Sequence, residues 1–145
     1  MIFREASVSD LEYLTNHPNI SKACGVPEGS MVDMSGVATT PRAVGFVSTL
    51  PGVVGGLMFG HLGDDVFDVH FMFLLGSSGK GVVKVSKAIL QEMFTNRGAR
   101  VIKGTPPRGN RAVRVIGISL GFTKIPNADF TNAQGHVCDT YEIRM

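Results

Sequence analysis

The chain has 145 residues, of which 43% are hydrophobic and 18% are charged. This length suits one domain that buries a core without metals or disulfides, and the composition excludes a disordered or fibrous chain. The net charge is +2 and the basic residues are scattered along the sequence, so nucleic-acid binding is not indicated. We therefore expect a single globular domain over residues 1–145.

The sequence shows no membrane segment and no cysteine framework. A charge at Arg4 interrupts the N-terminus, and no later window offers ~18 uncharged apolar residues in a row. Cys24 and Cys138 lie far apart and form no C-x-x-C pair, which argues against a zinc site and agrees with a reducing compartment. We expect a soluble, cytoplasmic protein.

A strand and a short helix open the chain. Residues 2–6 have the pattern of a strand, and a helix beginning near Val8 ends before Pro18. Residues 21–42 show no sustained period and contain several glycines and prolines. A loop of this length in a small domain is either a binding lid or a loose insertion, and the sequence leaves both open.

A β meander is predicted over residues 43–75, with turns at Pro51-Gly52 and at 63–65. Its last strand, 66–75, alternates cleanly between two faces. One face holds Phe67, Val69, Phe71 and Phe73, and the other holds Asp68, His70 and Met72. We expect the phenylalanine face to lie in the core.

The segment Ser78-Gly79-Lys80-Gly81-Val82-Val83 joins this strand to an amphipathic helix that we expect to begin at Val82 and to end at Gly98. A strand that passes through glycines directly into a helix presents unpaired amides and a positive helix end to one spot. Such a spot binds phosphate. A glycine turn that only reverses the chain is the alternative.

The last third is predicted to hold a strand at 100–105, a helix and two closing strands at 122–125 and 137–145. Asn110 is a good N-cap for the helix and Gly121 a good stop. Neither a repeat nor an interdomain linker is visible.

This order of elements resembles the GNAT superfamily of acyl-CoA-dependent acyltransferases. Ser78–Val83 is similar to the family's R-G-x-G-x-G/A loop, and Asn110 through Phe122 resembles its N-x-x-A-x-x-x-Y-x-x-x-G-F segment. The opening Phe3-Arg4-Glu5-Ala6 with Asp10-Leu11 also looks like a GNAT start. The resemblance implies an α+β or α/β fold, with a mixed, mostly antiparallel central sheet of six to seven strands and helices on both faces.

The resemblance also implies acetyl-CoA or CoA as cosubstrate, and no metal. Its pantetheine arm would contact the backbone around Met72, Phe73 and Leu74, and its pyrophosphate the amides of Gly79 to Val83. Asn110 would touch the cofactor, or serve only as the helix cap. The full set of implied cofactor-binding residues is Met72, Phe73, Leu74, Ser78, Gly79, Lys80, Gly81, Val82, Val83 and Asn110.

Three residues depart from the family pattern. Ser78 stands where Arg or Gln is usual, which removes a charge-assisted contact to phosphate. Val83 replaces a small residue and would crowd the phosphates. Gly117 replaces a tyrosine thought to protonate the departing thiolate. Because glycine in a helix costs about 1 kcal/mol relative to alanine, we expect close packing there or room for a ligand.

The base that acyl transfer requires is predicted on the polar face of strand 66–75. Asp68 and His70 share that face, and His61 on the neighbouring strand is the next candidate. Each could instead have no catalytic role, as a residue exposed to solvent or one whose hydrogen bonds are made within the protein. Metal is not expected, because the spacing of these residues with Asp64 and Asp65 matches no zinc motif. The Walker A and Rossmann patterns also fail.

Two functions therefore remain open. The first is an N-acyltransferase, with acetyl-CoA as the expected donor, acting on an unidentified small-molecule or protein amine that residues 21–42 and the final strands select. The second is a catalytically degenerate GNAT-fold protein that serves as a binding or assembly component, as in tailed phages. The apolar C-terminal strand leaves a homodimer open.

Overall fold

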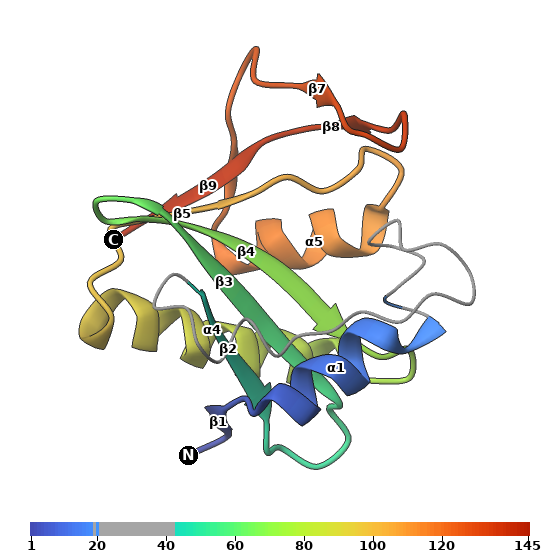
Figure 1. Ribbon diagram of the computed structural model, residues 1–145, viewed down its shortest axis with the longest axis vertical. Coiled ribbons are helices and arrows are strands. Elements are labelled where there is room, and N and C mark those ends of the chain that lie inside the picture. Colours follow the sequence, from blue (N-terminus) through green and yellow to red (C-terminus); the bar gives the residue numbers. More distant parts are fainter. Residues whose placement is uncertain (19, 21–42) are drawn as a thin grey trace.

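A seven-stranded sheet organises the chain in the computed structural model, which describes residues 1–18, 20 and 43–145 (Figure 1). The sheet order is β1-β2-β3-β4-β5-β9-β6, and β4 with β5 is the one parallel pair among the described strands. The elements are β1 (Phe3–Glu5), α1 (Val8–Asn16), β2 (Ala43–Ser48), β3 (Gly55–Gly63), β4 (Val66–Phe73), α4 (Gly79–Asn96), β5 (Val101–Gly104), α5 (Arg111–Leu120), β6 (Thr123–Lys124), β7 (Phe130–Thr131), β8 (Val137–Cys138) and β9 (Tyr141–Arg144). The predicted mixed, mostly antiparallel sheet is confirmed.

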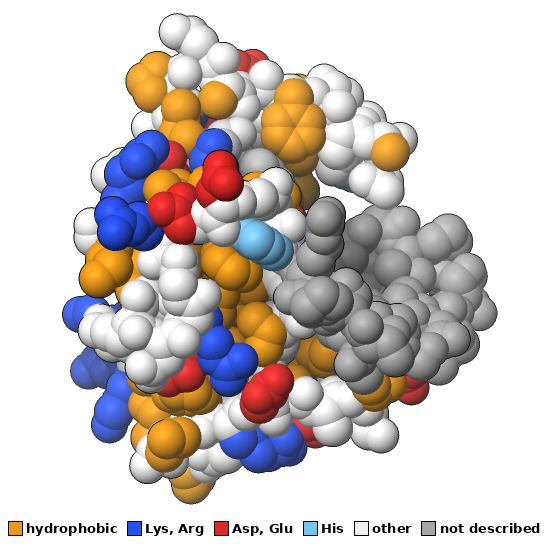
Figure 2. Space-filling view, turned by 60° about the vertical axis from the view of Figure 1, so that its left-hand side comes forward, with side chains coloured by type: hydrophobic (Ala, Val, Ile, Leu, Met, Phe, Trp, Pro, Cys, Tyr) orange, Lys and Arg blue, Asp and Glu red, His pale blue; other side chains and the backbone are white. Residues whose placement is uncertain are grey.

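Helices cover both faces of the sheet, as predicted. Leu11 and Leu14 of α1 are buried with Met72 on one face, whereas Val85 and Ile89 of α4 belong to the cluster on the other face. The α5 helix packs beside α4 (Figure 1). Among the described residues no helix has the length and apolarity needed to cross a bilayer. Basic side chains lie in several separate groups on the face drawn in Figure 2.

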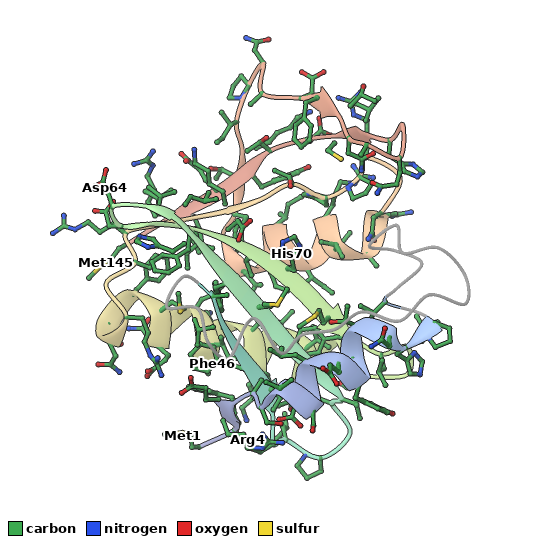
Figure 3. All side chains as sticks on the ribbon, viewed as in Figure 1. Met1, Arg4, Phe46, Asp64, His70 and Met145 are labelled. Atoms are coloured by element: carbon green, nitrogen blue, oxygen red, sulfur yellow. The ribbon has the colours of Figure 1, made fainter. Side chains whose placement is uncertain are left out.

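The β meander forms as expected, with β2, β3 and β4 paired antiparallel. Asp64 lies at the β3–β4 turn, and His70 lies near the middle of β4 (Figure 3). Residues 21–42, for which lid and insertion were both open, lie outside the described residues, and Cys24 is among them. Cys138 is buried and unpaired.

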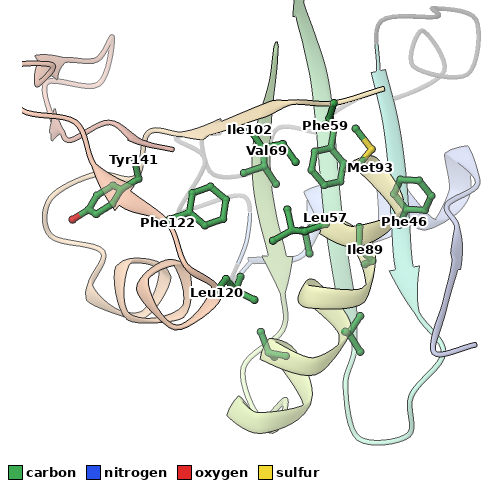
Figure 4. Close-up of a cluster of buried hydrophobic side chains, with 14 of the residues drawn as sticks. Phe46, Leu57, Phe59, Val69, Ile89, Met93, Ile102, Leu120, Phe122 and Tyr141 are labelled. Carbon is green, nitrogen blue, oxygen red and sulfur yellow. The ribbon is translucent and has the colours of Figure 1, made fainter. Parts of the chain in front are cut away.

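The main core lies between the sheet and α4 (Figure 4). Leu57 and Phe59 of β3 face Ile89 and Met93 of α4, and these four side chains are fully buried. Phe67, Val69, Phe71 and Phe73 of β4 pack on the same cluster. The predicted phenylalanine face is therefore the core face.

The α4 helix begins at Gly79, three residues before the predicted start at Val82. Ser78 is its N-cap, and the Ser78 hydroxyl accepts a hydrogen bond from the Gly81 amide. This cap offsets the low helix propensity of the two glycines in the first turn. At the other end, Gly98 has a φ of 76°, which agrees with its predicted role as the stop.

The α5 helix has the predicted N-cap and stop. The Asn110 side chain accepts from the Val113 amide, and Gly121 follows the helix with a φ of 102°. Gly117 is buried, but a Cβ built there would meet only the Phe122 Cβ, at 3.9 Å. Of the two reasons expected for this glycine, close packing is therefore excluded, and open space beside the helix remains.

The closing segment is more broken than predicted. The expected strand 137–145 is interrupted at Asp139, whose buried carboxylate accepts hydrogen bonds from the Arg108 guanidinium at 2.7 and 3.1 Å. The Lys124 ammonium lies 3.6 Å from the same carboxylate. The hydrogen bonds from Arg108 lower the pKa of the Asp139 carboxyl. This cluster ties the loop after β5 to the C-terminal segment.

The open space beside Gly117 can be tested by stability. Gly117→Ala should raise the free energy of unfolding by about 0.5–1 kcal/mol, because alanine restricts the unfolded chain and meets no obstacle in the helix. Gly121→Ala is the matched control and should lower it, because alanine is strained at positive φ. Urea denaturation measures both. Equal losses from the two changes would restore the close-packing explanation.

The Asp139 cluster predicts a pH-dependent stability. Because the folded-state pKa lies below the unfolded value of about 3.9, the ionised carboxylate stabilises the fold above that pH, and this contribution is lost as the pH falls toward the folded-state value. Asp139→Asn should therefore be less stable than the parent at pH 7, and the difference should shrink below about pH 4. Urea titrations at several pH values check this, and a difference independent of pH would contradict it.

Candidate functional site

The strands β4 and β5 separate part of the way along the sheet. They pair at Val66 with Val101, Phe67 with Ile102 and Asp68 with Lys103, and no further. The β5 strand ends at Gly104, and the prolines that follow cannot donate to a ladder. From Val69 to Phe73, β4 is therefore paired only with β3 on its other side.

A cavity of about 120 Å³ opens where the two strands part. Its walls come from β4, from the end of β5 with the loop after it, from α5 and from the start of β9. The lining residues are Val69, His70, Phe71, Gly104, Thr105, Pro106, Pro107, Asn110, Val113, Arg114, Gly117, Phe122 and Tyr141. Most of them are apolar, and no side-chain carboxylate is among those the structure describes there.

His70 and Asp68 lie together on the polar face of β4. The Asp68 Oδ2 atom is 3.8 Å from the His70 Nε2 atom, and the Asp68 Oδ1 atom accepts a hydrogen bond from the Gly60 amide at 2.8 Å. A Cβ at position 60 would lie 2.6 Å from that Oδ1 atom, so the glycine makes room for the Asp68 carboxylate. His70 lines the cavity and its side chain is 54% exposed. The pair presents an accessible imidazole next to a fixed carboxylate.

His61 lies away from this pair. Its Nε2 atom is 2.5 Å from the main-chain oxygen of Asp64, and its ring stacks on Phe67 with centroids 4.7 Å apart. Both partners belong to the β3–β4 turn region, and His61 does not line the cavity. The structure thus brings two of the three predicted candidates for the base together. Within the described residues no cluster of three or more His, Cys, Asp or Glu side chains could hold a metal ion.

The amides at the start of α4 are partly used by the protein itself. The Gly81 amide donates to the Ser78 hydroxyl at 3.3 Å and the Val82 amide to the Ser78 carbonyl at 2.8 Å. The Val83 amide lies inside the helix. In the described part of the chain only the Gly79 and Lys80 amides of this turn lack a partner. The expected cradle of five amides is therefore reduced to two.

The two glycines of this turn have different roles. A Cβ at Gly81 would lie 2.4 Å from the Val53 Cγ2 atom, so this glycine lets α4 approach the β2–β3 turn. A Cβ at Gly79 would meet nothing within 4 Å, so this position faces open space. Val83, which was expected to crowd the phosphates, is partly buried and packs on the main core. Only the Gly79 side of the turn remains accessible to an anion.

The residues predicted to contact the pantetheine arm, 72–74, differ in whether their main-chain groups are free to do so. The Leu74 amide donates to the Val54 carbonyl at 2.9 Å, and the Met72 side chain is buried under α1. Main-chain groups alternate sides along a strand, so Phe73, and Phe71 before it, direct theirs to the unpaired edge. Asn110 keeps both of its predicted roles open, because its Oδ1 caps α5 while its side chain lines the cavity.

Arg114 is a cavity residue that sequence reasoning did not single out. It lies on α5 one turn before Gly117 and next to Val113, and it lines the cavity. Its Nε atom is buried without a hydrogen-bond partner in the part of the chain that is described. The available signal was a basic residue within the run Val113 to Leu120, whose other inward positions are apolar or glycine.

The fold can be compared with known proteins. No family model and no curated sequence matches the chain. Among solved structures, it superimposes on the aminoglycoside acetyltransferase AAC(6')-Ib in complex with coenzyme A with a TM-score of 0.75 at 16% identity, covering 99% of this chain and 94% of that one. Spermidine N-acetyltransferase from Vibrio cholerae, in complex with CoA and spermine, gives a TM-score of 0.77 at 14% identity, covering 98% and 94%. The chain therefore has the fold of the GNAT acetyltransferases.

Proposed function

We propose that the protein is an acyl-CoA-dependent N-acyltransferase whose donor is acetyl-CoA. The observation that carries this proposal is the separation of β4 from β5, which leaves one strand edge unpaired beside a cavity. Main-chain groups at such an edge need partners, and an extended amide-containing arm supplies them. Two structures of the same fold were determined with CoA, which supports this choice of ligand.

The two ends of the unpaired β4 edge match the two ends of the proposed donor, its diphosphate and its thioester. Free amides at Gly79 and Lys80 and the positive end of α4 suit the diphosphate, although Ser78 supplies no charge there. From Phe73 back to Val69 the strand spans about 13 Å, at about 3.3 Å per residue. The arm of CoA is long enough to cover this length, so its thioester reaches the cavity beside His70.

His70 would remove the proton that the acceptor amine loses on attack. The His70 imidazole lines the cavity and is accessible. The Asp68 carboxylate lies beside it, in a position to orient it as a general base. An acyl-CoA supplies the activated acyl group. The unpaired edge of β4 positions the donor, and the apolar walls of the cavity exclude water from the reacting bond. His61 is given no part, because its ring contacts the β3–β4 turn.

A binding or assembly role without catalysis is the second candidate. The specific observation in its favour is that Ser78 occupies the Gly81 and Val82 amides, while Gly117 offers no acidic hydrogen to a leaving thiolate. Such a protein would bind acyl-CoA weakly or not at all. Binding measurements therefore separate the two candidates before any acceptor is known.

Gly79→Asp tests the diphosphate site. Isothermal titration should show that the parent binds acetyl-CoA and CoA at about micromolar strength, and that the variant binds at least tenfold more weakly, because its carboxylate meets the diphosphate. The variant should remain folded, since position 79 is open and an acidic residue suits a helix N-terminus.

Gly79→Ala and Asp64→Asn serve as controls, one adding bulk without charge and the other changing a charge at the distant β3–β4 turn. Both should bind like the parent. Absence of heat with the parent at millimolar ligand would leave only the assembly role, and normal binding by Gly79→Asp would move the diphosphate elsewhere.

His70→Ala tests the base. Turnover, followed as CoA release with a panel of amines that includes a polyamine, an aminoglycoside and a peptide N-terminus, should fall by about 10²–10⁴, while the affinity for acetyl-CoA stays unchanged. Asp68→Asn should lower turnover less. His61→Ala is the matched control and should react at the parent rate. An unchanged rate in His70→Ala would remove His70 from the reaction.

A further inference from the structure

We infer that Arg114 is the anion-binding residue of the cavity and that it stabilises the negative charge that forms on the CoA sulfur during acyl transfer. This inference rests on the proposed function. It assigns a catalytic role to a side chain of α5, on the opposite side of the cavity from His70 on β4.

The first observation concerns the Arg114 side chain. Within the described residues this side chain forms neither an ion pair nor a hydrogen bond, and its Nε atom is buried. Among the other arginines in the described ranges, five form ion pairs, namely Arg4, Arg97, Arg100, Arg108 and Arg144, and Arg111 is exposed to solvent. A buried donor without an acceptor is costly and uncommon, so a ligand that accepts from it is expected.

The second observation is the composition of the cavity wall. Arg114 is its one permanently charged side chain among the described lining residues, and most of the others are apolar. A cation in such surroundings attracts an anion more strongly than it would in water, because the screening is weaker. The cavity therefore favours a ligand that carries, or develops, one negative charge at the end of an apolar stem.

The third observation is the open space at Gly117. Positions 114 and 117 are three residues apart and so neighbour each other on one face of α5. A Cβ built at Gly117 would approach only the Phe122 Cβ, at 3.9 Å, so the cavity wall has open space next to the position of Arg114. The sulfur of a donor whose arm lies along β4 from Phe73 to Val69 would end at this cavity, because Val69 lines it.

The chemistry then divides between two side chains. The amine nitrogen bonds to the thioester carbon, the carbon–sulfur bond breaks, and the electron pair of that bond stays on sulfur. The amine proton passes to His70. Arg114 keeps its own protons, because a guanidinium is not an acid in this pH range, and it stabilises the thiolate through charge-assisted hydrogen bonds. The thiolate takes a proton from solvent after it leaves, and His70 returns its proton to solvent.

The test compares how CoA and acetyl-CoA binding depend on pH, by isothermal titration. The thiol of free CoA resembles a cysteine thiol, with a pKa of about 8.5, and Arg114 should lower this value in the complex. Affinity for CoA should therefore rise about tenfold or more from about pH 7 to about pH 9, as thiol is converted to thiolate. Acetyl-CoA has no thiol, so its affinity should not show this rise.

Among the described residues that line the cavity, the other titratable groups are His70 on β4 and Tyr141 on β9. Both face either ligand, so the ratio of CoA affinity to acetyl-CoA affinity cancels the effects that the two ligands share and retains those that depend on the thiol. In Arg114→Gln this ratio should lose its pH dependence. In Arg114→Lys, which keeps the charge, part of it should return.

Arg111→Gln, at an exposed position of the same helix outside the cavity lining, is the matched control and should behave like the parent. An Arg114→Gln protein with the parent's pH dependence would overturn the inference and leave the proposed function standing. Failure of the parent to bind either ligand would overturn both.

A measurement on the parent alone covers the case in which Arg114→Gln does not fold. The ultraviolet absorbance of the thiolate, followed for protein-bound CoA against free CoA, should show ionisation at a lower pH in the complex. Ionisation of bound CoA at the pH of free CoA or higher would overturn the inference without any variant.

Discussion

The separation of β4 from β5 is the constraint on which the site depends. Two parallel neighbours in a sheet normally pair along their shared length, and stopping after three residue pairs leaves main-chain groups without partners. The loop after β5 holds the strands apart. Pro106 accepts from the Asp139 amide, the Arg108 amide donates to the Val137 carbonyl, and the Arg108 guanidinium binds the Asp139 carboxylate. The cluster that anchors the C-terminal segment therefore also keeps the cavity open.

The alternation of β4 then divides the site between the two faces of the sheet. His70 and Asp68 project toward the side that carries α1, whereas Val69 and Phe71 project toward α4 and α5. The cavity reaches both, because it lies at the gap between the strands. The proposed proton acceptor on one face and the proposed Arg114 anion site on the other can act on the same bond without pairing with each other. A site built on one face would bring these two groups together, and they would compete for the same partner.

Features that depend on local pattern could be predicted from the sequence. The phenylalanine alternation of β4 placed the core face correctly, and Asn110 with Gly121 marked both ends of α5, because strand period and helix capping are local properties. The start of α4 was predicted too late, since the glycines of its first turn conceal a helix that Ser78 caps. The last strand, 137–145, was predicted as continuous, because the Arg108 contact at Asp139, where it is interrupted, is distant in sequence.

Residues whose role depends on the fold could not be assigned in the same way. Gly81 matched a phosphate-loop pattern, yet its closest neighbour is Val53 of a different segment. The sequence placed His61 just behind His70 as a candidate for the base, and only the register showed that His61 lies opposite Phe67 at the turn end of the sheet. A lone arginine on a helix is normally a solvated residue, so a basic side chain in an otherwise apolar helical run was too weak a signal to single out Arg114 before the structure placed it in the cavity wall.

The arrangement also says where donor affinity should come from. With Ser78 engaged in capping, the diphosphate of the proposed donor would be left with two amides and the helix dipole, all at a solvent-exposed turn where salt weakens such contacts. The unpaired edge of β4 lies beside a mostly apolar cavity, and each main-chain group that a ligand satisfies there removes a cost that the free protein bears. The middle and the reactive end of the proposed donor, rather than its phosphates, should therefore contribute most to recognition.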